Sequence, residues 1–476
     1  MITVLRTLTA AAAAALLLPG LSAPAAAQDA PRPLSTLEIA AIFSADQLNA
    51  RVLLVEAALA RAQAEEGVIP QVAAEAIVRA AVPGNIPLAE IEAENAVVRH
   101  RMVALLNVLR RSIDEESASY LHYGATTVDI YDTALMLQLR DAVLALIGDL
   151  RTIELQLIAA AEEHRATPMI GRTLGQHALP ITFGKKMSVW IGENRRHVER
   201  LHDLLARIER SAIMKGAVGS YLGLGPRAMA VETRLAGHLG FEAPYEDDWH
   251  SARDVIAEYA MVCGLISRSW SRFGQEIFLL QSTDIGELVE RRPAEAVGSS
   301  AMPHKSNPSL SEALIHRGRV IPRQAEIVAD DVINFFERDN TSRPITQVEE
   351  LSMEIELQLR DASRLIDRLD VFPARMRANL DRSQGWILSQ RVVFALSDHM
   401  PREQAEALMR ALADGARESG ASLSEAMAES DAITAVLSAE ARAALLDPAG
   451  YIGLAAEQTD AVIAAALSAR ASDRRP

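Results

Sequence analysis

The amino-acid sequence predicts an all-α protein organised around a long central helical bundle. Ala, Leu, Glu and Arg dominate its 476 residues, and these residue types favour helices. Aromatic residues make up only 4%, and alternating runs of β-branched residues are scarce, which argues against a β-sandwich or a barrel. Hydrophobic residues at 49% and charged residues at 23% are typical of a globular chain with a large core.

Apolar residues at helical spacing predict the individual helices. Ser44 begins a capping box that opens the first helix, and a second helix is predicted over residues 88–112. Five longer helices are predicted at residues 133–165, 180–213, 251–287, 309–334 and 347–369. A helix of about 30 residues is about 45 Å long, so these five predict an extended bundle.

Changes in predicted helix length, together with the positions of glycines and prolines, predict four segments along the chain. Residues 1–27 form a targeting segment, and residues 28–130 form an N-terminal helical domain. Residues 131–372 form the long-helix bundle. From Pro373 onward the predicted helices shorten and are separated by glycines and prolines, so residues 373–476 are predicted to form a C-terminal helical domain.

The first residues have the pattern of a secretory signal peptide. Arg6 precedes an apolar stretch over residues 8–18, Pro19 breaks it, and Ala25 and Ala27 supply a small-residue cleavage site. The apolar run is too short to span a membrane. We therefore expect a periplasmic or secreted protein that begins near Gln28 and has no membrane association after cleavage. The alternatives are a mis-assigned start codon or an Ala-rich tail without a targeting role.

Charge and cysteine content exclude several kinds of function. The formal net charge is −15, which argues against a nucleic-acid partner. Cys263 is the only cysteine, so neither an intrachain disulfide nor a cysteine-based zinc cluster can form. No histidine pair has metal-ligand spacing on a helix with a third ligand nearby, and no metal site is predicted.

Residues 298–308 form the most informative motif, with the sequence GSSAMPHKSNP. A loop that places hydroxyls, a lysine and an amide close together can bind a carboxylate and hold a serine where a proton must leave. This string resembles the signature loop of the fumarase/aspartase superfamily, G-S-S-x-M-P-x-K-x-N-P.

Two further motifs resemble the same superfamily. The string HYGATTVD at residues 122–129, followed by Asp132, is similar to its first signature. Residues 171–184, which begin with Gly171, Arg172 and Thr173, are similar to the second. The resemblance extends from about Leu34 to the last helices. Adenylosuccinate lyase and bacterial 3-carboxy-cis,cis-muconate cycloisomerase are the two branches that the chain resembles most.

The resemblance implies a fold, an assembly and a reaction. It implies an all-α subunit of three domains, assembled as a homotetramer whose active sites combine residues of three subunits. It implies a small-molecule polycarboxylate substrate and neither a metal nor an organic cofactor. In the shared chemistry, loss of a proton next to a carboxylate gives an aci-carboxylate. A leaving group then departs from the adjacent carbon, with release of fumarate or a similar alkene.

Roles for individual residues follow from the resemblance. Ser300 corresponds to the general base, and Lys305 and Asn307 correspond to residues that bind carboxylate and stabilise the dianion. Thr126 and Thr127 correspond to the pair that holds the other carboxylate. The remaining predicted substrate-binding residues are Arg99, His100, Gln176, Arg338 and Arg343.

One position departs from the lyase pattern. The lyases carry a histidine as general acid directly after the Arg-Thr of the second signature, and this chain has Leu174 there. Leucine cannot transfer a proton, so His100, His122 or His177 is predicted to replace it. His177 is favoured because residues three apart share a face if the segment is helical.

Three functions remain open from the sequence. The first is an adenylosuccinate-lyase-like lyase that breaks a carbon–nitrogen or carbon–oxygen bond by β-elimination on a succinyl-type polycarboxylate. The second is a cycloisomerase that opens or closes a lactone on a carboxymuconate-like acid. The third is an inactive helical oligomer with a binding role, although the presence of Ser300, Lys305 and Asn307 argues against it.

Overall fold

The computed structural model describes residues 38–293, 295, 301, 302, 304–339, 341 and 345–473. These residues form nineteen α-helices and two small two-stranded sheets, which confirms the predicted all-α class. The predicted signal peptide, Ser300 and Arg343 lie outside the described residues.

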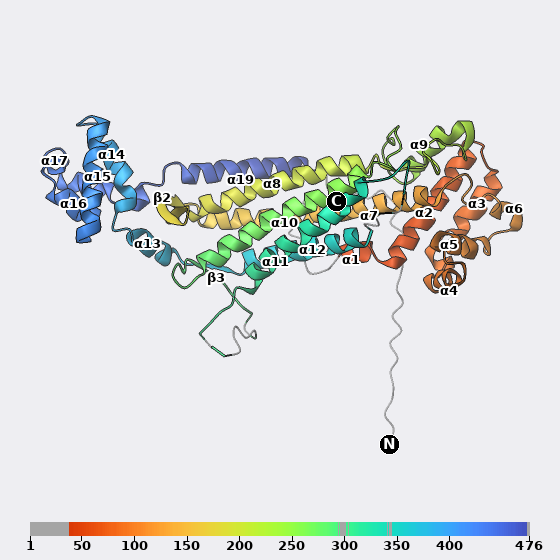
Figure 1. The fold of residues 1–476 in the computed structure, drawn as a ribbon, viewed down its shortest axis with the longest axis horizontal. Coiled ribbons are helices and arrows are strands. Elements are labelled where there is room, and N and C mark those ends of the chain that lie inside the picture. The colour runs from red at the N-terminus through yellow and green to blue at the C-terminus, as the bar shows by residue number, and fades with distance from the viewer. Residues whose placement is uncertain are drawn as a thin grey trace, which may run out of the picture.

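Five long helices lie side by side and form the elongated centre of the molecule (Figure 1). They are α7 (Thr127–Glu163), α8 (Phe183–Ile208), α10 (Asp254–Leu280), α11 (Ser309–Ala329) and α12 (Ile345–Asp367). Each corresponds to a helix predicted from apolar spacing, with its ends shifted. The longest, α7, has 37 residues. It is therefore about 55 Å long and reaches from one end of the bundle toward the other.

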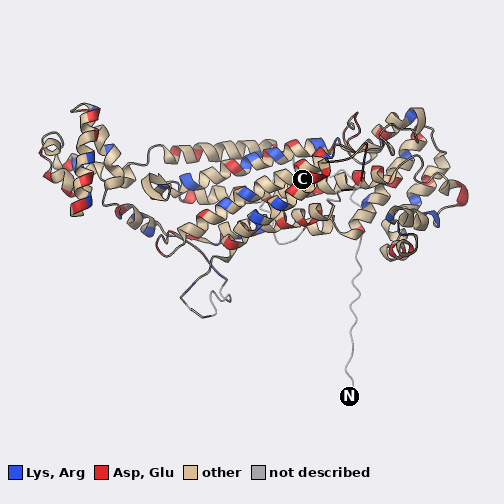
Figure 2. Cartoon of the chain, in the orientation of Figure 1, with Lys and Arg blue, Asp and Glu red and all other residues tan. Residues whose placement is uncertain are grey.

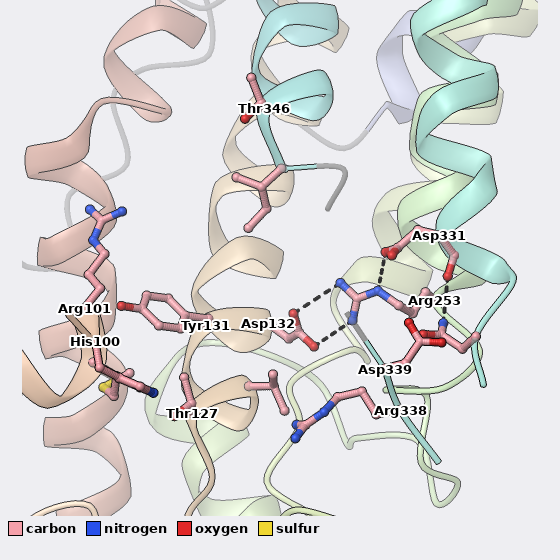
Figure 3. A pocket seen from close by; sticks show the side chains of 14 residues that line it. His100, Arg101, Thr127, Tyr131, Asp132, Arg253, Asp331, Arg338, Asp339 and Thr346 are labelled. Carbon is pink, nitrogen blue, oxygen red and sulfur yellow. Dashed lines mark hydrogen bonds and ion pairs between the residues drawn. The ribbon is translucent and has the colours of Figure 1, made fainter. Parts of the chain in front are cut away.

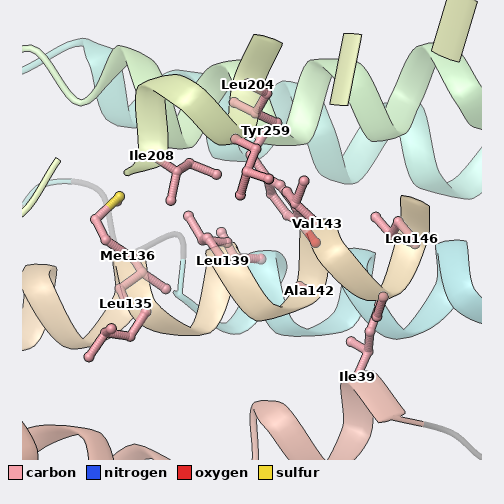
Figure 4. Packing of buried hydrophobic residues seen from close by; sticks show 14 of the residues in the cluster. Ile39, Leu135, Met136, Leu139, Ala142, Val143, Leu146, Leu204, Ile208 and Tyr259 are labelled. Carbon is pink, nitrogen blue, oxygen red and sulfur yellow. The ribbon is translucent and has the colours of Figure 1, made fainter. Parts of the chain in front are cut away.

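The central helix α7 is buried around most of its circumference. Twenty-four of its 37 residues are buried, which is typical of a helix surrounded by other helices. Figure 4 shows its apolar side chains packed against three neighbouring elements. Leu139 and Val143 of α7 lie near Ile208 of α8 and Tyr259 of α10, while Ile39 approaches from the opposite side. A single hydrophobic cluster thus ties the bundle to the N-terminal helices.

Capping at residue 126 explains why α7 begins earlier than predicted. Thr126 has an extended backbone, with φ −110° and ψ 159°, and precedes the first helical residue. Its backbone N–H donates to Asp129 Oδ2 at 2.9 Å, as expected of an acidic residue in the first helical turn. The polar residues of the first predicted motif therefore lie at the N-terminus of the longest helix.

The N-terminal helices surround that end of the bundle. They are α1 (Glu38–Ile42), α2 (Ala45–Glu65), α3 (Gln71–Ala80), the 3₁₀ turn η2 (Pro83–Asn85), α4 (Leu88–Val98), α5 (Arg101–Arg110) and α6 (Glu115–Ala118). The predicted N-cap of α2 is confirmed, since Ser44 Oγ accepts the N–H of Gln47 at 3.3 Å. The prediction of one helix over residues 88–112 is wrong. Arg99 adopts a left-handed conformation with φ 52°, which ends α4.

A β-hairpin at the opposite end of the bundle replaces the expected start of the α8 helix. Strands β1 (Pro168–Thr173) and β2 (Gln176–Thr182) pair antiparallel, with Thr173 opposite Gln176. Leu174 and Gly175 make the two-residue turn with φ 52° and 75°, as hairpin turns of the I′ type require. The helical face proposed for Leu174 and His177 is therefore wrong.

Short elements complete the bundle. The 3₁₀ turn η3 (Gly225–Arg227) and α9 (Ala228–His238) lie near the N-terminal helices. Strands β3 (Leu288–Glu290) and β4 (Leu369–Val371) pair antiparallel, and the 3₁₀ turn η4 (Asp330–Val332) follows α11. Within the described residues, no helix combines the length and apolar character needed to cross a membrane.

The C-terminal segment divides between two places. Its elements are α13 (Pro373–Asp381), η5 (Trp386–Leu388), α14 (Ser389–Ser397), α15 (Arg402–Ser419), α16 (Leu423–Glu429), α17 (Asp431–Thr434), α18 (Ala439–Leu445), η6 (Pro448–Gly450) and α19 (Ala455–Ser472). Helices α14 to α17 share a separate small hydrophobic cluster. Helix α19 returns and packs along α8 (Figure 1). The domain limits predicted from the sequence remain a prediction.

Candidate active site

A cavity of about 600 Å³ opens at the N-terminal end of α7 (Figure 3). Helices α5, α7 and α12 and the segments around η4 and the start of α10 contribute its side chains. It is lined by His100, Arg101, Met102, Thr127, Val128, Tyr131, Asp132, Arg253, Asp331, Asn334, Arg338, Asp339, Ile345 and Thr346. Three predicted substrate-binding residues therefore lie together on one cavity: His100, Thr127 and Arg338.

The wall formed by α5 and α7 carries hydrogen-bond donors. His100 is the N-cap of α5, and its Nδ1 accepts the backbone N–H of Val103 at 3.3 Å. The neutral imidazole must therefore carry its proton on Nε2. Figure 3 shows this ring directed toward Thr127, at the first residue of α7. Arg101 and Tyr131 line the same wall.

The opposite wall is built on a buried ion-pair triad. Arg253 Nη1 donates to Asp132 Oδ2 at 2.9 Å, and Arg253 Nε donates to Asp331. Burial by itself lowers the pKa of Arg253, but the charges and hydrogen bonds of both aspartates outweigh burial and raise the pKa. The triad joins α7, the start of α10 and η4, so it fixes the position of this wall.

Arg338 enters the cavity from the loop after η4. Its Nη1 is buried and has no hydrogen-bond partner among the described residues. The neighbouring Asp339 is engaged by its own loop, because it accepts the N–H groups of Phe335 at 2.6 Å and Thr341 at 2.7 Å. These bonds lower the pKa of Asp339. Arg338 Nη1 therefore has an unused hydrogen-bond donor at the cavity, and its role in substrate binding stays a prediction.

A buried polar cluster contacts the first turn of α7. Asp129 accepts the backbone N–H groups of Lys215 at 3.0 Å and Gly216 at 3.1 Å. Burial raises the pKa of Asp129 and outweighs these hydrogen bonds. Lys215 is itself buried, and its Nζ donates to Glu232 at 3.0 Å and to the Tyr221 hydroxyl at 2.6 Å. This lysine therefore supports the fold around the site and does not line the cavity.

His122 forms a buried pair beside this cluster. Its Nδ1 lies 2.6 Å from Oε1 of Glu56, which is 1% exposed. Burial lowers the pKa of His122, but the hydrogen bond and charge of Glu56 outweigh it, so the pKa is raised. His122, Thr126 and Arg99 do not line the cavity, although all three lie next to elements that do.

The second predicted motif lies far from this cavity in the same chain. Arg172 of the hairpin makes two hydrogen bonds with the buried Glu287, at 3.0 and 2.6 Å. Gln176 and His177 are exposed, and Leu174 at the tip is 98% exposed. Partial burial and the charges of Arg172 and Arg382 lower the pKa of His177. The length of α7, about 55 Å, separates the hairpin from the cavity.

The third motif lies at the start of α11, on the hairpin side of the bundle. Lys305 and Asn307 are exposed there and are not among the residues that line the cavity. The predicted base, Ser300, and the predicted substrate-binding Arg343 lie outside the described residues. Among the described residues, a single chain therefore does not bring the three predicted motifs together.

Several residues that line the cavity were not predicted from the sequence. Arg101, Tyr131 and Asp331 were not among the predicted site residues, although all line it. Tyr131 follows Thr127 by four residues, so helical spacing alone places both on one face of α7. The roles of Arg253 and Asp331 depend on an ion pair between distant segments. No local pattern reveals such a pair.

Charges and potential metal ligands are distributed without a dedicated centre. Figure 2 shows basic and acidic residues interspersed along the helices. In the part of the chain that the structure describes, no group of three or more His, Cys, Asp or Glu side chains is arranged to hold a metal ion.

Comparisons with known proteins identify the family. The model of the family described as Lyase matches residues 34–322, and that described as Adenylosuccinate lyase C-terminus matches residues 385–462. The chain is 35% identical over 433 residues to N-acetyl-S-(2-succino)cysteine lyase of Enterococcus italicus, covering 90% of this chain and 94% of the relative. It is 36% identical over 428 residues to 3-carboxy-cis,cis-muconate cycloisomerase of Pseudomonas aeruginosa, and the match covers 87% of this chain and 91% of that relative.

A solved structure supports the same assignment. The crystal structure of fumarate lyase from Mesorhizobium sp. BNC1 matches with a TM-score of 0.83 and 33% identity, covering 91% of this chain and 99% of that one. The helical fold of this chain therefore matches the fold of that structure. On these grounds the chain belongs to the fumarase/aspartase superfamily of lyases.

Proposed function

We propose that the protein catalyses a cofactor-free β-elimination on a succinyl-type polycarboxylate, releasing fumarate and a thiol. The observation that carries this proposal is Leu174, an aliphatic side chain at the tip of the hairpin where the resemblance places a proton donor. A lyase without that donor needs a leaving group that departs as a stable anion. The relative named N-acetyl-S-(2-succino)cysteine lyase supports a thiol as that group.

The acidity of the leaving group decides which bond can break without an acid. A free thiol has a pKa of about 8.5, whereas an alcohol or a simple amine is a far weaker acid. A thiolate therefore leaves with little help, and a hydrogen-bond donor is sufficient to stabilise it. His100 offers such a donor in the cavity, because its Nδ1 is occupied by Val103 and its Nε2 carries the proton. This favours His100, which lines the cavity, over His177, which does not.

The proposed reaction balances without any co-reactant. Ser300 removes a proton from the carbon next to a carboxylate, and Lys305 and Asn307 stabilise the resulting aci-carboxylate. The second carboxylate binds Thr127 at the N-terminus of α7, where the helix dipole favours negative charge. The electron pair then forms the alkene as the carbon–sulfur bond breaks. The products are fumarate and a thiolate, which takes up a proton.

Such a site requires more than one chain, and we propose a homotetramer. The three predicted motifs lie at different places along the bundle, with the hairpin and α7 N-terminus about 55 Å apart. Met261 and Leu265 on α10 are 46% and 47% exposed, and Val189 on α8 is 45% exposed. Long helices with exposed apolar side chains are typical of surfaces that a second subunit covers. A periplasmic or secreted location, from the signal-peptide pattern, belongs to the same proposal.

The cycloisomerase remains a second candidate because the identity to the Pseudomonas aeruginosa enzyme is similar, at 36%. In lactone opening, the departing group is a carboxylate, which also leaves without an acid. The absence of a donor at Leu174 is therefore compatible with both reactions. The two candidate reactions are therefore distinguished by the substrate that the protein converts.

Direct assay of two substrates tests the proposal. Purified protein is incubated with N-acetyl-S-(2-succino)cysteine or with 3-carboxy-cis,cis-muconate. Fumarate is followed by ultraviolet absorbance, and thiol is followed with a thiol reagent. The background is low, because Cys263 is the only cysteine, is fully buried and has its pKa raised by burial to about 12. Ser300→Ala serves as the control.

We expect equal amounts of fumarate and thiol from the thioether. Ser300→Ala should release both products at least about 100-fold more slowly, which is the contribution expected of a positioned proton-transfer group. Turnover of the muconate alone would establish the cycloisomerase instead. Turnover of neither, with both compounds bound, would favour the inactive oligomer with a binding role.

A further inference from the structure

The two walls of the cavity differ in how their charges are compensated. On the side of α10 and η4, Arg253 is paired with both Asp132 and Asp331. On the side of α5, the side chain of Arg101 is exposed and has no ion-pair or hydrogen-bond partner among the described residues. Arg111, which follows the last residue of α5, is by contrast paired with Glu94. In a chain with a net charge of −15, an arginine left without a carboxylate beside a cavity indicates a site for an anion.

The surroundings of Arg101 offer a donor and no carboxylate. Tyr131 lines the cavity one turn after Thr127, and Figure 3 shows its hydroxyl directed toward Arg101. Burial raises the pKa of Tyr131 and outweighs the opposite effect of the Arg101 charge. The hydroxyl is therefore a neutral donor. The three carboxylates of the cavity, on Asp132, Asp331 and Asp339, lie on the other side (Figure 3).

We propose that Arg101 and Tyr131 form a subsite for a carboxylate carried by the leaving group. This inference rests on the proposed function, since it adds a third carboxylate to the two of the succinyl moiety. Those two are assigned to Thr127 and to the loop of Lys305 and Asn307. The substrate class is then a succinyl thioether whose thiol half is itself anionic, such as an N-acylated amino acid.

Size and geometry agree with this class. Cavities of about 300–1,000 Å³ take ligands much larger than fumarate, and this one has about 600 Å³. A guanidinium binds a carboxylate through two parallel N–H groups, which gives orientation as well as affinity. Arg101 would thereby hold the thiol half in place while the carbon–sulfur bond breaks.

A matched pair of ligands tests the subsite. N-acetyl-S-(2-succino)cysteine carries the third carboxylate, and its cysteine methyl ester lacks that charge. Dissociation constants for both are measured by calorimetry in the Ser300→Ala background, so that bound ligand is not consumed. The compared variants are Arg101→Met, Arg101→Lys and Arg110→Met. Arg110 is an exposed arginine of α5 that does not line the cavity, and it provides the control.

We expect Arg101→Met to weaken binding of the acid about tenfold or more, in keeping with a charged hydrogen bond. Binding of the ester should change less than twofold. Arg101→Lys should restore part of the affinity, and Arg110→Met should resemble the parent. Equal losses for acid and ester, no loss for either, or failure of the parent to bind both ligands would overturn the subsite.

Measurements of turnover distinguish a failure of the subsite from a failure of the proposed lyase reaction. Fumarate release from the acid without any dependence on Arg101 would retain the lyase and refute the subsite. Arg101-dependent binding without fumarate release from the Ser300-containing protein would retain the subsite and refute the lyase.

Discussion

Removing the cation of the buried triad should destabilise the protein strongly. Arg253 is 12% exposed at its side chain, and its partners Asp132 and Asp331 are 7% and 6% exposed. Arg253→Met keeps much of the side-chain length but leaves two carboxylates buried without their partner. Breaking a buried pair in this way costs about 3–5 kcal/mol.

We therefore expect Arg253→Met to lower the free energy of unfolding by about 3–5 kcal/mol. Arg207→Met is the matched control. Its ion pair with Glu258 is 41% and 34% exposed, and such pairs contribute about 0–1 kcal/mol.

Urea unfolding at one fixed protein concentration measures both variants against the parent. The triple variant Arg253→Met, Asp132→Asn and Asp331→Asn should regain most of the loss, because its uncompensated charges are gone. A loss below about 1 kcal/mol for Arg253→Met, or one equal to that of Arg207→Met, would refute the view that the triad holds this wall.

Four further predictions concern acid catalysis, pH, processing and assembly. Leu174→His should leave the turnover rate of the thioether within about twofold of the parent and accelerate a succinyl-amine substrate about tenfold or more. Steady-state kinetics on both substrates would measure these rates, and a faster turnover of the thioether would contradict the prediction. Because Glu56 raises the pKa of His122, their pair stabilises the fold fully below about pH 6.5 and loses this contribution as pH rises through the raised pKa. The stability difference between parent and Glu56→Gln, from denaturant unfolding, should therefore shrink from pH 6 to pH 8 (about the histidine range), and a constant difference would count against the pair. N-terminal sequencing of protein from the native host should begin near Gln28, whereas a chain that retains residue 1 would disprove export. Light scattering should give about four times the subunit mass, and a monodisperse monomer would rule out the tetramer.

The sequence by itself determined the fold class, the family and the chemistry of the motifs. Helical spacing is a local property, so the five long helices were predicted and confirmed. The string at residues 298–308 is specific enough to indicate the superfamily, and the comparisons agree with it. Pattern also indicated that Leu174 cannot serve as an acid. None of these inferences requires knowledge of which segments meet in space.

The tertiary structure decided the rest. The break of the predicted helix at Arg99 and the hairpin turn at Leu174 both depend on left-handed backbone conformations, which residue types other than glycine adopt only where the surrounding structure requires them. The α5–α7 wall joins segments 30 residues apart in the sequence, from Arg101 to Tyr131, and the Arg253 triad joins three more distant ones. Such contacts are set by packing of the whole bundle, because long-range ion pairs leave no periodic pattern in the chain.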